Sequence, residues 1–75
     1  VQSAQLAQMQ AQANVARADA RLAQSELDRA QTLVERGFIS KADIDRRTAT
    51  RDSANARAVS AAAAVREMEA RIGRL

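Results

Sequence analysis

Three residues near the middle of the chain have side chains suited to contact with another protein. Arg29 and Leu33 are four residues apart, and Ser40 follows seven residues later, just beyond Gly37. A spacing of four places Arg29 and Leu33 on one face of a helix. Arginine offers five hydrogen-bond donors on a long side chain, and leucine offers apolar surface. We therefore consider them candidate partner-binding residues, against the alternative that Leu33 only widens a helix interface and Ser40 only caps a helix.

The composition argues against catalysis. The chain contains no His and no Cys, which removes the commonest general base and the thiolate nucleophile. Carboxylates two residues apart on a helix point to different faces, and this spacing holds for Asp43 with Asp45 and for Glu67 with Glu69. The sequence thus predicts a protein that is not an enzyme, with no catalytic residue, no metal ligand and no cofactor.

The charge pattern does not favour nucleic acid. Twelve basic and nine acidic residues give a net charge of +3, and they are spread along the chain without stacking aromatics. We expect no nucleic-acid binding; a weak alternative is an arginine-rich helix that binds nucleic acid or anionic lipid through Arg46, Arg47, Arg51 and Arg57. No apolar run approaches the roughly 18 residues of a membrane-spanning helix, so no span is expected in this segment.

Small and apolar residues recur at alternating spacings of three and four in two long segments. The first set is Leu6, Met9, Ala13, Ala16, Ala20, Ala23, Leu27, Ala30 and Val34. The second set is Ile44, Ala54, Ala58, Ala61, Val65, Met68, Ile72 and Leu75. This is the heptad rhythm of a coiled coil. We call these positions the seam, and expect a leucine at Ala20 or Ala58 to overpack it by about 1–3 kcal/mol, whereas one at Gln24 should be nearly neutral.

A break separates the two segments. Gly37 is suited to the left-handed position that follows the end of a helix. Ser40 is suited to the N-cap position of the next helix. Asp43 stands where a capping box has its acidic partner. The short connection forces antiparallel neighbours.

The expected fold is therefore all-α, an antiparallel two-helix coiled-coil hairpin. We predict a helix over 2–36, a turn over 37–40 and a helix over 41–73. Residues whose numbers sum to about 77 should then lie at the same height. Because both ends of a hairpin lie together, we expect the segment to be an insertion in another domain.

Arg47 and Arg51 are polar residues that occupy seam positions. Their side chains should extend outward along their apolar stems or pair with acids such as Asp28 or Glu26. They would loosen the packing below the turn or mark a contact between neighbouring hairpins. Pairs of the type Asp43–Arg47 and Glu67–Arg71 are expected to support the helices by a few tenths of a kcal/mol each.

The stretch from Arg29 to Asp45 resembles the hairpin tip of periplasmic adaptor proteins, also called membrane fusion proteins. The matching features are the spacing of Arg29, Leu33 and Ser40, the run Ile-Ser-Lys-Ala-Asp-Ile-Asp over 39–45, and the alanine-rich continuation. Arg47 and Arg51 depart from the family, whose seam is small at these positions.

The resemblance implies a hairpin inserted in a lipoyl-like domain of an adaptor that forms hexamers in the periplasm and is anchored to the inner membrane. Its tip would dock on a TolC-type outer-membrane channel through Arg29, Leu33 and Ser40, and the rest of the adaptor would hold an inner-membrane transporter. The implied roles are efflux, multidrug resistance or type I secretion. The alternative is a structural coiled coil that dimerises or spaces domains without a dedicated tip contact.

Overall fold

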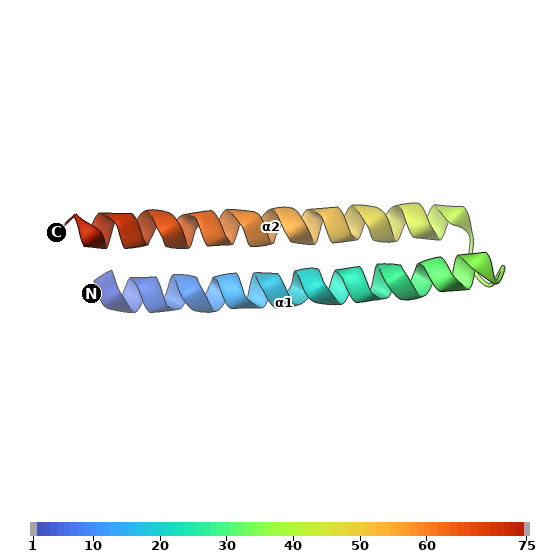
Figure 1. The fold of residues 1–75 in the computed structure, drawn as a ribbon, viewed down its shortest axis with the longest axis horizontal. Coiled ribbons are helices and arrows are strands. Elements are labelled where there is room, and N and C mark those ends of the chain that lie inside the picture. The colour runs from blue at the N-terminus through green and yellow to red at the C-terminus, as the bar shows by residue number, and fades with distance from the viewer. Residues whose placement is uncertain (1, 75) are drawn as a thin grey trace.

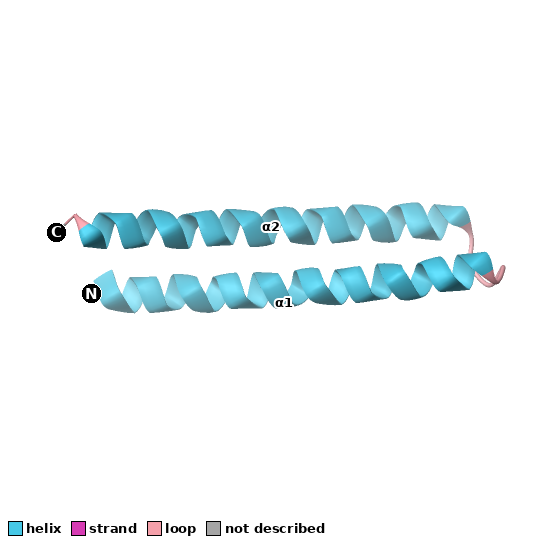
Figure 2. Cartoon of the chain, in the orientation of Figure 1, coloured by secondary structure: helices cyan, strands magenta, loops and turns pink. Residues whose placement is uncertain are grey.

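The structure, a computed structural model, describes residues 2–74. Two helices, α1 (Gln2–Glu35) and α2 (Lys41–Gly73), run antiparallel and side by side along their whole length (Figure 1). They form a rod of 58 × 14 × 12 Å. Within the described residues, only the turn between the helices and Arg74 after α2 lie outside the two helices (Figure 2). The predicted all-α antiparallel hairpin is confirmed.

The core is a thin line of mostly small side chains between the helices. The buried residues are Ala13, Ala23, Leu27, Ala30 and Ala54. All predicted seam positions of α1 are buried or half-buried, and so are those of α2 apart from Arg47; Leu75 lies outside the described residues. Because alanine side chains are small, this core holds little apolar area between the helices.

The predicted register of the two helices agrees with the surface hollows that both helices border. Residues whose numbers sum to 77 or 78 border the same hollow in four cases, which are Met9 with Met68, Ala13 with Val65, Ala30 with Arg47, and Val34 with Ile44. Height along the rod can therefore be read directly from residue numbers.

The end of α1 is a Schellman motif, which sets the position of the turn. The Gly37 N–H donates to the Val34 carbonyl at 2.9 Å, and the Phe38 N–H donates to the Leu33 carbonyl at 2.8 Å. Gly37 has φ +79°, in the left-handed region where glycine avoids a Cβ clash. The motif ends α1 at Glu35, one residue before the predicted end.

Gly37→Ala is expected to lower the free energy of unfolding by about 1–2 kcal/mol, because an L-residue is strained at this positive φ. A Cβ at Gly37 would meet no atom within 4 Å, so the cost comes from the backbone alone. Gly73→Ala is the matched control, because Gly73 is helical and alanine is the better helix former. Urea unfolding followed by circular dichroism checks the difference; equal stabilities would show that the turn is not held in this conformation.

Ser40 caps α2 as predicted. Its hydroxyl accepts a hydrogen bond from the Asp43 N–H at 3.3 Å, and its own backbone is extended. The Asp43 carboxylate does not complete a capping box, because Arg46 Nη2 donates to its Oδ1 at 3.0 Å. The expected pairing of Asp43 with Arg47 is thus wrong.

At the other end of α2, the expected i,i+4 pair is present. Arg71 Nη2 lies 3.0 Å from Glu67 Oε1. Both side chains are exposed, so the pair contributes little to stability.

Candidate partner-binding tip

Arg29 and Leu33 border one shallow hollow close to the closed end of the rod, which is the end formed by the turn between α1 and α2. The hollow has a volume of about 170 Å³, and its lining is completed by Glu26, Ala30 and Arg47. Leu33 is half-buried and Arg29 is exposed. Apolar surface and a guanidinium are therefore presented together on one flank, which we call the Arg29 flank.

Ser40 lies beyond the turn from this hollow and does not line it. Its side chain is used at the start of α2, where it caps the helix. The structure thus brings together two of the three predicted tip residues, and it shows the third in the role that positions α2. A contact of Ser40 with a partner stays a prediction.

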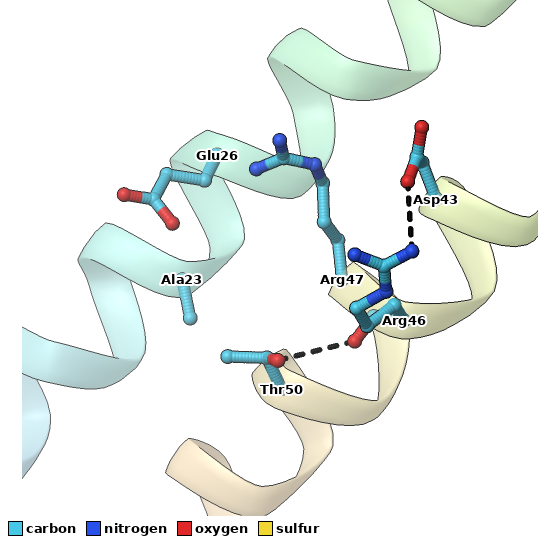
Figure 3. Close-up of a pocket in the computed structure, with 6 residues that line it drawn as sticks. All are labelled: Ala23, Glu26, Asp43, Arg46, Arg47 and Thr50. Carbon is cyan, nitrogen blue, oxygen red and sulfur yellow. Dashed lines mark hydrogen bonds and ion pairs between the residues drawn. The ribbon is translucent and has the colours of Figure 1, made fainter. Parts of the chain in front are cut away.

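Arg47 also belongs to the surface of the Arg29 flank. It borders the hollow of Arg29 and Leu33 and also the adjoining one of about 240 Å³. Figure 3 shows its side chain reaching from α2 towards α1, while the Arg46 side chain turns to Asp43. Arg47 is exposed although it occupies a seam position.

Thr48 takes the inward position that Arg47 leaves. It is half-buried, and its hydroxyl donates to the Ile44 carbonyl at 2.9 Å. This bond satisfies the threonine without a partner on α1, so the polar side chain is tolerated beside the seam.

A hairpin with this seam and this turn can be compared with known families. Residues 4–73 match the family described as RND MFP, alpha-helical hairpin domain, where MFP denotes membrane fusion protein. The match covers nearly the whole chain. The chain belongs to this family. A search of curated proteins and a search of solved structures found no match.

Members of this adaptor family are periplasmic. Between residues 2 and 74, no helix of the adaptor hairpin has the length and apolarity needed to cross a membrane. The same part of the chain holds no cluster of three or more potential metal ligands.

Phe38 is a prominent feature of the tip that the sequence analysis missed. This single aromatic residue of the chain is 71% exposed. It follows the helix-ending Gly37, at the position of a Schellman motif that often makes an apolar contact with the last turn of the helix. The position of Phe38 directly after Gly37 was the sequence signal that could have identified it. Aromatic side chains are enriched at protein interfaces, so Phe38 adds apolar surface at the tip of the adaptor hairpin to that of Leu33.

Arg51 crosses the seam on the opposite flank. Its Nη1 donates to Gln24 Oε1 at 3.0 Å, and its Nε lies 2.7 Å from Asp52 Oδ1. Gln24 Nε2 in turn donates to Asp28 Oδ1 at 2.9 Å. Arg51 thus pairs with an acid, as one of the two expected arrangements has it, but the acid is Asp52. Gln24 stands between Arg51 and Asp28. Gln24 is half-buried and links the two helices, so it is no longer a suitable neutral control position.

Proposed function

We propose that the hairpin docks by its tip, residues 29–40, onto a TolC-type outer-membrane channel and so links the channel to an inner-membrane transporter for efflux or secretion. The observation that carries the proposal is the meeting of Arg29 and Leu33 in one hollow at the closed end of a 58 Å rod. The family description names RND adaptors, which favours an RND-type transporter as the inner partner and a role in drug efflux.

The chemistry of the tip supports docking to a folded protein. Leu33 and Phe38 supply apolar area that water covers in the free hairpin, and burying such area favours association. Arg29 makes no hydrogen bond or ion pair with the described residues, so its five donors are available to backbone or polar groups of the channel. Ser40 would lie at the same contact while it caps α2.

The shape of the hairpin supports its place in a larger adaptor. The start of α1 and the end of α2 lie together at the end of the rod opposite to the tip (Figure 1). An insertion in a lipoyl-like domain would join the hairpin there and leave the tip free. In this arrangement the rod spans part of the periplasm, and the anchor to the inner membrane belongs to the rest of the adaptor.

Exposed apolar side chains support self-association of hairpins side by side, as the hexamer of the family requires. Val15 and Leu22 are exposed and lie fourteen and seven residues before Arg29, so they share its flank. Val59 is exposed as well and lies eighteen residues, about five turns, after Lys41. Lys41 borders a hollow with residues of α1 on the other flank.

The heights of these residues match between neighbouring copies. By the sum of 77, Val59 lies level with Ala18, which stands between Val15 and Leu22. A ring formed by rotation alone keeps equal heights together. Val59 of one copy would therefore enter the gap between Val15 and Leu22 of the next, as a knob enters a hole.

A disulfide test checks this lateral contact in the full-length adaptor. Cysteines at Ala18 and Val59 should cross-link separate copies into a ladder under mild oxidation, because their Cα atoms would come within the 4.4–6.8 Å that a disulfide spans. The control pair places cysteines at Ala18 and Arg66, which is on the Val59 flank but about two turns away. Equal ladders from both pairs, or none from the first, would rule out this register.

The docking proposal is tested by channel binding and transport of the variants Arg29→Asp and Leu33→Ala. Loss of both activities with intact helices supports it. Unchanged activity would leave the structural coiled coil as the better account.

A further inference from the structure

Two arginines line the same hollow at the tip. Arg29 comes from α1 and Arg47 comes from α2, and Leu33 lies beside them. Arg47 is level with Ala30 by the sum of 77, so it lies between the heights of Arg29 and Leu33. We propose that Arg47 is a further partner-binding residue and that Arg29 and Arg47 together bind a carboxylate side chain of the docked channel. This inference rests on the proposed function and adds the chemistry that the partner must supply.

The freedom of Arg47 is the first support. Among the described residues, it makes no hydrogen bond and no ion pair within 4.0 Å. Its neighbour Arg46 has the Asp43 carboxylate at 3.0 Å, and Arg51 has both Asp52 and Gln24. Of these three neighbouring arginines in α2, Arg47 is thus the one whose donors are available.

The charge of the hollow is the second support. Its lining contains two guanidiniums and one carboxylate, that of Glu26, which forms no ion pair within 4.0 Å of any described residue. One positive charge is left over, and like charges that share a partly enclosed site repel each other. A carboxylate from a partner would relieve this repulsion and would be held by two planar donor groups.

The position of Leu33 is the third support. An apolar side chain at the edge of the contact would exclude water when the channel docks, and hydrogen bonds between charged groups are stronger where water is excluded. The hollow therefore joins the two kinds of contact that dominate interfaces, an apolar side chain and arginines that become desolvated. Arg47 departs from the residue, usually small, that the resembled family has at this position, so this contact would distinguish the channel preference of this adaptor.

The experiment measures binding of the full-length adaptor to its outer-membrane channel, both purified in detergent, by biolayer interferometry. Arg47→Gln should weaken binding about tenfold or more, because it removes one partner of a charge-assisted contact. Arg47→Lys should be intermediate, since it keeps the charge and loses the planar fork. The matched control is Arg66→Gln, which removes the same charge from an exposed residue of α2 far from the tip and should change the affinity less than twofold.

The outcomes separate this inference from the docking proposal. If Arg29→Asp abolishes binding and Arg47→Gln binds as tightly as Arg66→Gln, the tip docks but Arg47 has no part in it, and the inference is overturned. If none of these variants changes the affinity, the docking proposal falls as well.

Light scattering on the same samples decides between a channel contact and a contact between hairpins. A change of oligomeric mass in Arg47→Gln, with unaltered channel affinity per adaptor, would assign Arg47 to a neighbouring copy and overturn the inference. Melting curves followed by circular dichroism should be the same for the three variants because Arg47 and Arg66 are exposed. If Arg47→Gln unfolds, the channel affinity of Arg47→Lys is compared with that of wild type instead.

Discussion

Replacing Arg29 by Asp or Leu33 by Ala in the full-length adaptor is expected to abolish transport while the hairpin keeps its helicity. Arg29 is exposed and makes no contact on which the fold depends, so its change should cost the hairpin less than about 0.5 kcal/mol. Leu33 is half-buried at the flank of the seam, so its truncation to alanine should lower the free energy of unfolding less than truncation of a core leucine. The loss therefore arises at the contact with the channel. Transport in cells at matched protein abundance, together with circular dichroism, provides the measurement.

Leu27→Ala is the structural control for Leu33→Ala. Leu27 is 2% exposed, and truncation of a buried leucine costs about 2–5 kcal/mol. Leu27→Ala should therefore lower the melting temperature clearly, while Leu33→Ala should lower transport more than stability. If both variants transport at a level that follows only their stability, the tip has no separate role.

Ser40 needs a control of its own because it caps α2. Ser40→Ala should cost about 1 kcal/mol through the lost cap, which by itself could reduce activity. Aspartate caps as well as serine, so Ser40→Asp restores the cap and adds a charge at the proposed contact. Loss of channel binding in Ser40→Asp with a wild-type melting curve would place Ser40 at the contact; wild-type binding would leave it a cap alone.

The fold was predictable because its determinants are local and repeat. The heptad spacing decides which face of each helix is buried, and it placed Ala13, Leu27 and Ala54 correctly in the core. The turn was predictable because Gly37 and Ser40 each have one strongly favoured backbone role. At the seam and at the turn, the side chains are short or the backbone conformation restricts which residues fit. The residue type therefore decides which positions are buried and where the helices end.

The polar contacts were less predictable because long side chains have several arrangements of nearly equal energy. Asp43 has Arg46 at i+3 and Arg47 at i+4, and both spacings allow a pair of similar strength. The pairing with Arg46 leaves Arg47 free to border the hollow at the tip. A seam position fixes where a Cα lies but not where an arginine extends.

Gln24 is a second residue whose polar contacts did not follow from its sequence position. Its heptad position lies beside the seam, which suggested that a leucine there would be neutral. The structure uses its amide to bridge Arg51 and Asp28, because an amide can accept from one neighbour and donate to the other.

Overpacking the middle of the seam is the second large effect that we expect. Ala54 is 2% exposed and lies level with Ala23, which is 7% exposed. Ala54→Leu should lower the free energy of unfolding by about 1–3 kcal/mol, because the added atoms force the helices apart. Ala20 and Ala58 are only half-buried, so leucine there should cost less. Ala56→Leu is the matched control because Ala56 is exposed on the same helix and leucine is nearly as good a helix former as alanine. Urea unfolding compares the variants.

The sign of this result tests how the helix spacing is set. Burial of a leucine side chain by itself is favourable by about 1.5–3 kcal/mol, so Ala54→Leu can destabilise only if the helices cannot separate without losing other contacts. A variant more stable than wild type would mean that the seam is slack and that neighbouring hairpins set the spacing. A destabilised variant would mean that the alanines themselves set it. In that case the same change should also weaken channel binding, because separating the helices moves Arg47 on α2 away from Arg29 and Leu33 on α1.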